Sequence, residues 1–321
     1  MRKTVNELWT RWHRRHWRRS PATDLTIGLA PLVCITGGSS GIGRALAFEF
    51  ARRGHALLLI ARDPSALERT ARAIRAESPG AEVHVHHTDL RHAANRQGLE
   101  AHAAALGYYI DVLVNAAGIG LSGPVVSHSV PETLDLIALN VDAVTDLTRK
   151  MLPGMLARGR GGVLTISSLA ADVPGPFQAT YYASKAFVSS FMAALAWEVR
   201  GHGVRVTDVS PGAVDTDFHA KMGAEGSAYL FPGARLSRER VAQAALSGFL
   251  AWRRRVVPGV APKIACVAVH FAPRWAAAPI MALLLHPRRH PDGPRKSARR
   301  EHVEKDKPDV RDLAEPQTDA D

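Results

Sequence analysis

The sequence predicts an α/β fold built on a single doubly wound parallel sheet with helices on both faces. From Pro31 onward, short apolar runs alternate with amphipathic helical patterns, which is typical of a parallel sheet covered on both sides. The connections are short, and no internal repeat of short period interrupts the alternation. A glycine-rich turn joins the first apolar run to the first helical pattern, which favours a ligand-binding sheet of this class.

Six strands are expected, five at apolar runs and one, Glu82–His87, where valine and histidine alternate. They are Leu32–Thr36, Ala56–Ala61, Glu82–His87, Ile110–Asn115, Gly162–Ser167 and Val204–Val209. Ser237 is expected to cap a helix that runs through Phe249, and Val256–Pro258 is similar to a final edge strand. Sheets of this class bind ligands at the carboxyl edge of the strands, so residues that follow each strand are the site candidates.

Basic residues concentrate at the start of the chain. The net charge is +11, and residues 2–19 carry seven Lys or Arg against one Glu. Trp9 and Trp12 lie at helical spacing opposite arginines, so residues 1–30 are interpreted either as a basic amphipathic arm for an anionic membrane surface or as a frayed leader. An organelle transit peptide ranks lower because serine is scarce. Nucleic-acid binding has only the charge behind it, so no nucleic acid is expected as a partner.

Two cysteines, Cys34 and Cys266, offer no disulfide framework, so a reduced, cytoplasmic setting is expected. The arm is charged and lacks the apolar core of a secretory signal. The longest late apolar run, Trp275–Leu285, has 11 residues and is shorter than the about 20 needed to span a bilayer. The expected organisation is an arm, a catalytic domain, an apolar extension and a disordered charged tail, at residues 1–30, 31–258, 259–286 and 287–321.

The turn Thr36–Gly43 has the composition of a phosphate-binding loop. Gly37 permits a tight turn, Gly41 lets the backbone approach a pyrophosphate, and Gly43 lets the following helix pack closely on the sheet. An ordinary strand–helix connection is the alternative, but after the first strand of a βαβ pattern a dinucleotide site is favoured. The residues expected to contact the dinucleotide here are Gly37, Ser39, Ser40, Gly41, Ile42 and Gly43.

A tyrosine and a lysine, Tyr181 and Lys185, are spaced i, i+4, which places both side chains on one face of a helix. The ammonium favours the phenolate and so lowers the pKa of the tyrosine from about 10 toward neutrality. Such a tyrosine can act as a general acid or base. Ser168 follows the buried-type run Val163–Ile166, which puts a hydroxyl at the carboxyl edge of the sheet.

Together these motifs resemble the short-chain dehydrogenase/reductase family. The glycine turn matches Thr-Gly-x-x-x-Gly-x-Gly, and the other family motifs follow in order over residues 31–218: Asn115-Ala116-Ala117-Gly118, Asn140, the set Ser168, Tyr181 and Lys185, and Pro211-Gly212. The resemblance implies a Rossmann-type sheet that binds a nicotinamide dinucleotide. It also implies an oxidoreductase that transfers a hydride between the nicotinamide and a carbonyl or secondary alcohol.

The resemblance assigns catalytic roles to four residues. Tyr181 would exchange a proton with the substrate oxygen, which Ser168 would hydrogen-bond and position. Lys185 would lower the pKa of the tyrosine and reach the nicotinamide ribose, and Asn140 would hold a water that links Lys185 to solvent. Tyr182 is out of register with Lys185 and is expected to be packed. The alternative function is a sensor or scaffold that binds NADP without turnover, against which the intact set of four argues.

Cofactor preference is expected to depend on the end of the second strand. Ala61 takes the place of the acidic residue that binds the ribose in NAD-dependent relatives, and Arg62 follows it. A guanidinium suits a 2′-phosphate, so NADP is favoured over NAD, although Asp63 could pair with Arg62. Asp89 resembles an adenine-binding aspartate, with the N-cap of a helix near Arg91 as the alternative. The resemblance places the remaining cofactor contacts at Asn115, Ala116, Gly118, Tyr181, Lys185, Pro211, Gly212, Val214 and Thr216.

No metal site is expected. His84, His86 and His87 crowd the third strand, but no cysteine or carboxylate set completes a ligand group.

Residues 218–235 have the composition of a mobile lid, and the apolar lid and extension favour a lipophilic carbonyl or alcohol substrate. A homo-oligomer, dimer or tetramer, is implied through two helices, the one expected from about Pro131 to Leu156, which holds Asn140, and the one that holds Tyr181. Peripheral membrane contact is a separate expectation, through residues 1–20 and 260–286.

Overall fold

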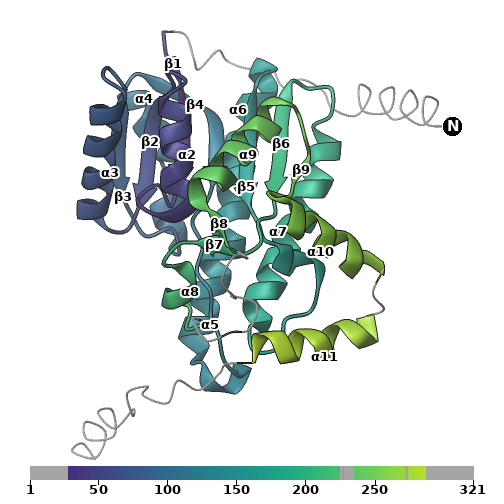
Figure 1. Cartoon of the computed structure of the whole chain (residues 1–321). Coiled ribbons are helices and arrows are strands. Elements are labelled where there is room, and N and C mark those ends of the chain that lie inside the picture. Colours follow the sequence, from purple (N-terminus) through teal and green to yellow (C-terminus); the bar gives the residue numbers. More distant parts are fainter. Residues whose placement is uncertain (1–27, 225–226, 228–234, 272–273, 287–321) are drawn as a thin grey trace, which may run out of the picture. The chain divides into compact units, whose positions relative to one another are not determined.

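The computed structural model describes residues 28–224, 227, 235–271 and 274–286. In this part of the chain, seven parallel strands form one sheet in the order β3-β2-β1-β4-β5-β6-β9 (Figure 1). The predicted α/β, doubly wound Rossmann-type fold is therefore confirmed. The strands are β1 (Ala30–Thr36), β2 (Ala56–Ala61), β3 (Val83–His87), β4 (Tyr108–Asn115), β5 (Gly161–Ile166), β6 (Val204–Val209) and β9 (Arg255–Val256). A separate two-stranded sheet pairs β7 (Val214–Asp215) with β8 (Leu236–Ser237).

Helices cover both faces of the large sheet, and each face has its own buried cluster. One cluster joins the sheet to α4 (Leu99–Ala105), α6 (Ala143–Arg158) and α7 (Ala179–Glu198). The other joins it to α2 (Gly41–Ala51), α3 (Pro64–Glu77) and α9 (Arg238–Leu250). The remaining helices are α5 (Val130–Ile137), α8 (Phe218–Lys221), α10 (Val260–Phe271) and α11 (Arg274–Leu285).

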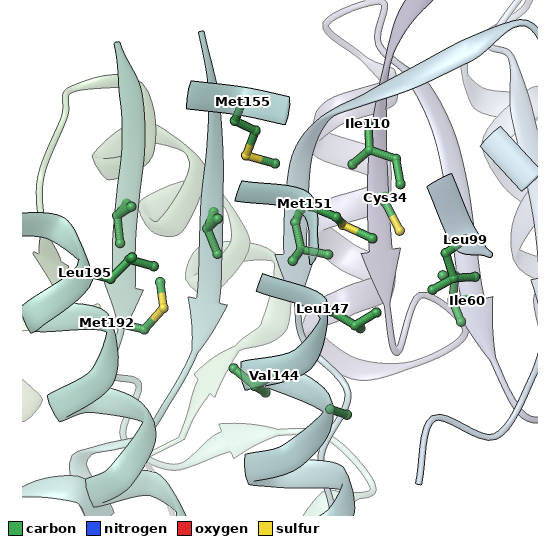
Figure 2. Close-up of a cluster of buried hydrophobic side chains, with 14 of the residues drawn as sticks. Cys34, Ile60, Leu99, Ile110, Val144, Leu147, Met151, Met155, Met192 and Leu195 are labelled. Carbon is green, nitrogen blue, oxygen red and sulfur yellow. The ribbon is translucent and has the colours of Figure 1, made fainter. Parts of the chain in front are cut away.

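Burial on both faces explains why the central strands have continuous apolar sequences rather than alternating ones. All six residues of β5 are buried, as are the last five of β1. Figure 2 shows Met151 and Met155 of α6 and Met192 of α7 packed against the strands, with Met151 lying toward Cys34 of β1. Burial raises the pKa of the Cys34 thiol to about 12, so this cysteine packs as an apolar side chain.

Predicted strand boundaries agree with the observed ones to within two residues, but two helix predictions need correction. The helix expected from Pro131 to Leu156 is divided into α5 and α6 by a π-helical turn, Ala138–Asp142. The helix expected near Arg91 starts later, with a 3-10 turn at Ala93–Arg96 before α4. The predicted arm up to residue 27, the tail from residue 287 and most of the lid lie outside the described residues.

Candidate active site

A cavity of about 1090 Å³ opens at the carboxyl ends of the central strands, where the predicted motifs converge. Most of the predicted site residues line it: Gly37, Ser39, Ser40, Gly41, Ile42, Arg62, Asp89, Ala116, Gly118, Ser168, Tyr181, Lys185, Pro211, Gly212, Val214 and Thr216. Three others, Gly43, Asn115 and Asn140, lie behind this lining and act on it through neighbours. Residues far apart in sequence are thus brought together around one cavity.

The glycine turn is held rigidly against the end of β4. Gly37 has a positive φ of +69°, and a side chain there would approach the Ala116 carbonyl oxygen to 2.9 Å. A Cβ at Gly43 would lie only 2.4 Å from the Gly37 carbonyl oxygen. Thr36 Oγ1 accepts hydrogen bonds from the Ala116 and Ala117 amides, both at 3.1 Å. The turn therefore has one backbone path, and only glycine fits its two closest approaches.

The first turn of α2 faces the cavity with amides that no side chain caps. Ser40 occupies the N-cap position with extended backbone, but its hydroxyl makes no capping bond. The first N–H groups of a helix lack intrahelical partners and carry partial positive charge. At Gly41, with φ +53°, a Cβ would meet nothing closer than the Thr216 side chain at 3.6 Å. This turn fits a diphosphate group.

Tyr181 and Lys185 lie at the start of α7 and are both buried. The Lys185 ammonium donates to the Ile166 carbonyl oxygen at 2.9 Å, and its nitrogen lies 5.9 Å from the centroid of the Tyr181 ring. Burial lowers the pKa of Lys185 to about 8, while the charge of Asp208 opposes that shift. The Tyr181 ring packs against Phe218 with centroids 5.5 Å apart. The phenol is thus held beside a buried cation in the wall of the cavity.

Ser168 directly follows β5 and starts the 3-10 turn Leu169–Asp172. Its Oγ accepts a hydrogen bond from the Ala170 amide at 3.1 Å. That bond uses an oxygen lone pair, so the hydroxyl proton can be donated to a ligand in the cavity. The same bond fixes the position of the oxygen.

Asn140 lies in the π-helical turn and is only 1% exposed. Its Oδ1 accepts from the Ile119 amide at 3.0 Å, and its Nδ2 donates to the Ile119 carbonyl oxygen at 2.9 Å and to Ser184 Oγ at 3.1 Å. A Cβ at Gly118 would lie 3.3 Å from Asn140 Oδ1 and 3.6 Å from Lys185 Nζ. Asn140 therefore ties the loop after β4 to α7 immediately beside Lys185. Its role in a proton relay stays a prediction.

Asn115 differs in placement from the other cofactor candidates. It is buried, and its Nδ2 donates to Thr148 Oγ1 and Thr165 Oγ1, both at 3.2 Å. These bonds join β4 to α6 and β5, away from the cavity. The side chain supports the neighbouring Ala116 and Gly118, which do line it.

The end of β2 presents Arg62 to the cavity, with Ala61 beside it. The alternative that Asp63 engages Arg62 is not what the structure shows. Asp63 is the N-cap of α3, and its carboxylate accepts from the Ala66 amide at 3.0 Å. The guanidinium is therefore exposed at the cavity rim rather than held by its neighbour in the sequence.

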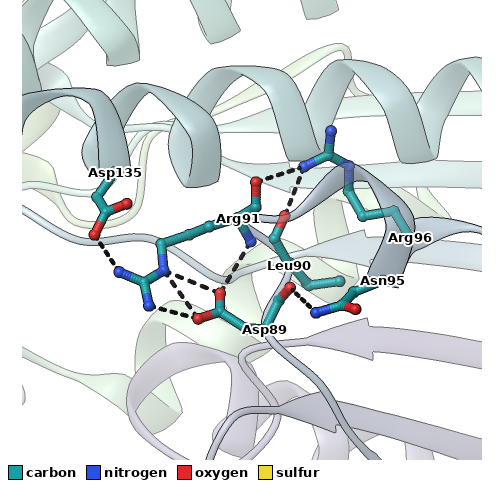
Figure 3. Close-up of polar contacts among 6 residues, drawn as sticks. All are labelled: Asp89, Leu90, Arg91, Asn95, Arg96 and Asp135. Carbon is teal, nitrogen blue, oxygen red and sulfur yellow. Dashed lines mark hydrogen bonds and ion pairs between the residues drawn. The ribbon is translucent and has the colours of Figure 1, made fainter. Parts of the chain in front are cut away.

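Asp89 lies in a network of ion pairs at the cavity wall (Figure 3). Its carboxylate accepts from the Arg91 amide at 3.0 Å and pairs with the Arg91 guanidinium at 2.5 Å, and Arg91 also pairs with Asp135 of α5. Hydrogen bonds from Arg91 lower the pKa of Asp89 to about 2. The N-cap interpretation is wrong, because this local bond closes a turn before any helix begins. Adenine binding by Asp89 stays a prediction.

The other half of the cavity is apolar, and sequence reasoning identified its residues only as a region. Its lining includes Leu169, Val173, Phe218, Met222, Val260, Pro262 and Met281. Val260 and Met281 show that α10 and α11, the predicted apolar extension, pack at this mouth. The sequence showed only that residues 259–286 are mostly apolar and contain no Asp or Glu. Such a composition does not reveal which side chains face the cavity.

The described residues contain no group of three or more His, Cys, Asp or Glu side chains that could hold a metal ion. His86 of β3 instead lies with its ring 4.5 Å from that of His102.

None of the described helices is both long and apolar enough to cross a membrane.

Comparison with known proteins identifies the family. A model described as short chain dehydrogenase matches residues 31–226. The chain belongs to the short-chain dehydrogenase family. Very-long-chain 3-oxoacyl-CoA reductase of Anas platyrhynchos is 39% identical over 198 residues, which cover 59% of this chain and 61% of the relative. The chain thus spans about three fifths of the length of this curated relative.

Two solved members of the short-chain dehydrogenase family share the fold. A short-chain dehydrogenase from Sphingobium yanoikuyae in complex with NADPH is 32% identical with a TM-score of 0.67, over 74% of this chain and 92% of that one. One from Burkholderia phymatum in complex with NAD is 26% identical with a TM-score of 0.66, over 75% of this chain and 92% of that one.

Proposed function

We propose that this short-chain dehydrogenase is an NADP-dependent oxidoreductase that acts on a carbonyl or secondary alcohol. The observation that carries the proposal is one cavity that Ser168, Tyr181 and Lys185 line together with an uncapped helix terminus. A nicotinamide dinucleotide bound along the glycine turn would supply the hydride for carbonyl reduction. The reductase name of the Anas platyrhynchos relative supports the reaction class.

The chain's own residues supply proton transfer and orientation. Tyr181 donates a proton to the carbonyl oxygen as the reduction proceeds and removes it in the reverse direction. Ser168, whose Oγ is fixed by the Ala170 amide, donates a hydrogen bond to the same oxygen and stabilises the charge that develops there. Lys185 favours the phenolate of Tyr181. Asn140 holds the loop beside Lys185 and supports return of the proton.

The cofactor contacts follow from the lining. The α2 amides and the turn from Gly37 to Gly43 would hold the diphosphate, with Ser39 and Ile42 beside it. Asp89 would bond the adenine, and Ala116 and Gly118 leave room for the chain to pass close to the cofactor. On the far side, the Val214 backbone and the Thr216 hydroxyl would fix the carboxamide next to the turn Pro211-Gly212.

We infer a preference for NADP because Arg62 is exposed at the rim and no carboxylate occupies position 61. Replacing Arg62 with Gln should lower the kcat/KM ratio of NADPH to NADH by about 10- to 100-fold, since a charge-assisted hydrogen bond contributes about 1.5–3 kcal/mol. Initial rates with both cofactors measure this ratio. Arg69, a surface residue of α3, provides the matched control as Arg69→Gln. Equal ratios in wild type and Arg62→Gln would argue against this cofactor contact.

The apolar half of the cavity favours a lipophilic substrate such as a fatty-acyl or steroid-like ketone, and a 3-oxoacyl thioester is suggested by the relative's name. The test is a panel of ketones, alcohols and 3-oxoacyl thioesters of increasing chain length, followed by nicotinamide absorbance. Turnover that rises with chain length supports the proposal. Tight NADPH binding with no turnover on the whole panel would favour the alternative, a protein that senses or scaffolds the cofactor.

We also propose that α10 and α11 rest on an anionic lipid surface. Val260, Ile264 and Leu283 are 72%, 64% and 79% exposed beside the cavity mouth. Helices α10 and α11 carry Lys263 and Arg274 and no acidic residue. An apolar, basic surface of this kind suits an anionic membrane interface, from which a lipophilic substrate could enter directly.

Flotation with anionic vesicles tests this attachment. The double variant Ile264→Asp/Leu283→Asp should lose flotation, whereas Val126→Asp, at a 94% exposed apolar residue elsewhere, should keep it. A truncated chain that lacks residues 1–20 separates the contribution of the basic arm. Recovery of the wild type only in the soluble fraction would count against lipid contact.

Assembly into a dimer or tetramer is proposed through α5 and α7. Val130, Leu134 and Phe187 expose apolar surface on these helices. Light scattering should give a multiple of the 34.7 kDa chain mass, and Phe187→Glu should shift it toward the monomer.

A further inference from the structure

A buried carboxylate lies on the sheet beneath α7 and has no part in the mechanism above. Asp208 of β6 is 2% exposed. Its Oδ2 accepts from Ser189 Oγ at 2.7 Å and from Ser210 Oγ at 3.3 Å, whereas its Oδ1 has no hydrogen-bond partner in the described part of the chain. A buried carboxylate that is only half satisfied is costly unless a cation lies nearby.

The nearest catalytic cation is Lys185, which α7 presents on the same side. Ser189, the donor to Asp208, lies one helical turn after Lys185. Lys185 Nζ bonds the carbonyl of Ile166, and Ile166 pairs across the sheet with Val209, the residue after Asp208. The ammonium and the carboxylate are therefore held over adjacent strands, under one helix.

We propose that Asp208 is a positioning residue for the reaction, the counterion that keeps the buried Lys185 ammonium charged so that Tyr181 stays acidified. The inference rests on the proposed roles of Tyr181 and Lys185. Burial alone disfavours the ammonium, and Asp208 is the charged group whose field opposes it. From the other side, Asn140 and Ser184 present only neutral groups to this region.

Arg255 is the competing partner of Asp208. Its Nε donates to Ser210 Oγ at 3.1 Å, and its Nη2 pairs with Asp172 Oδ2 at 2.6 Å, while Cys266 Sγ lies 3.6 Å from the same oxygen. Because Arg255 already has Asp172 as a direct partner, it leaves the charge of Asp208 only partly compensated. Lys185, Asp208, Arg255 and Asp172 thus alternate in charge, and the two end members, Lys185 and Asp172, both line the cavity.

This arrangement predicts opposite effects from two substitutions. Asp208→Asn keeps the shape and can still accept from Ser189, but it removes the charge, so Lys185 should lose its proton about 1 pH unit lower or more. Arg255→Gln removes the opposing cation at a partly exposed position, so the same midpoint should rise. General damage to the fold would not move a titration in two directions.

The experiment is competitive labelling of the full chain with acetic anhydride as a function of pH, with Lys185 acetylation quantified by mass spectrometry. The lysine midpoint should fall in Asp208→Asn, rise in Arg255→Gln and stay in place in the surface control Glu68→Gln. If Asp208→Asn fails to fold, the rise in Arg255→Gln still tests the alternation of charge. An unchanged midpoint in both variants overturns the proposal.

Kinetics then separate this inference from the proposed function. Alcohol oxidation by Asp208→Asn at pH 9 should fall about tenfold or more, because a neutral amine no longer helps Tyr181 to act as a base, and Asp208→Glu should restore part of the loss. Shifted midpoints in a chain that turns over no alcohol or ketone would refute the enzyme assignment while leaving the electrostatic coupling of Asp208 to Lys185 intact. A loss of rate with unmoved midpoints would reduce Asp208 to a structural role.

Discussion

The two walls of the cavity differ in what faces the ligand: one wall is mainly backbone, and the other is mainly side chains. The wall expected to face the dinucleotide is backbone held from behind: Thr36 clamps the loop after β4, and Gly43 lies against the Gly37 carbonyl. The opposite wall consists of side chains such as Phe218, Met222 and Met281 on the short helix α8, just after it and on α11. Backbone geometry tolerates almost no change, whereas side chains are exchangeable. We therefore expect the backbone wall to hold the cofactor and the side-chain wall to select the substrate.

The largest effect is expected at the point where the walls meet. Tyr181→Phe should reduce kcat by about 10²–10⁴-fold, because it removes general acid–base help while keeping the ring packed on Phe218. Steady-state kinetics and NADPH titration measure the two quantities separately, and cofactor affinity should hold. Tyr182→Phe is the matched control and should keep most of the activity. Full turnover by Tyr181→Phe with every accepted substrate would remove the basis of the proposed mechanism.

The second-largest effect is expected on the free energy of unfolding, when the buried ammonium is removed in Lys185→Met. The folded-state pKa of Lys185 is about 8 against an ordinary 10.5, so the unfolded chain binds more protons between these values and stability rises with pH across that window. Below pH 8 the full cost of burying the charge is present, about 3 kcal/mol. The stability of Lys185→Met relative to wild type should therefore be about 2.5 kcal/mol more favourable at pH 7 than at pH 10, where part of the cost remains. Urea unfolding of both proteins at the two pH values measures this, and a pH-independent difference would contradict it.

Gly43→Ala tests whether the backbone of the glycine turn can shift to accept an added methyl group. The added methyl group would lie 2.4 Å from a backbone oxygen, so α2 must shift, at a cost of about 1–3 kcal/mol. We expect a lower melting temperature and at least tenfold weaker NADPH binding. Gly54→Ala is a control with open space around the added group, although its positive φ makes it mildly strained. Unchanged cofactor affinity in Gly43→Ala would show that this wall is less rigid than its contacts indicate.

Met281→Ala should give the smallest change, on the tolerant wall. Removing a partly buried side chain from the apolar lining should raise KM for long-chain ketones by about 10-fold, with little effect on short ones, since each buried methylene contributes about 0.8 kcal/mol. The ratio of KM values for long and short substrates measures this effect. An equal rise for both would mean that Met281 supports the fold rather than the substrate.

The backbone wall of the cavity could be predicted from the sequence, whereas the side-chain wall could not. The strand positions and the convergence of Gly37, Ser168, Tyr181 and Lys185 were predictable, because buried strands have continuous apolar runs and the motifs have fixed spacing. The inward-facing residues of α10 and α11 were not, since an apolar segment without strict periodicity does not reveal which face is buried.

Local polar bonds account for the remaining differences. Asp89 was expected as a possible N-cap, but its bond to the Arg91 amide closes a turn, and the helix starts further on. The role of Asp208 could not be predicted, because Asp208 lies on a strand and the residue it acts on, Lys185, lies on a helix 23 positions earlier. Charge pairs between distant elements have no signature in sequence spacing.

The π-helical turn at Ala138–Asp142 constrains how this chain can change in length. It accommodates one residue more than a regular helix would, which turns Asn140 toward Ile119 and Ser184. Deleting a single residue there would restore an even helix but rotate one half against the other by about 100° and withdraw the amide from both partners. We therefore expect surface loops to accept insertions and deletions, and the spacing between α5 and α6 to accept neither, although this turn lies about 40 positions before Tyr181.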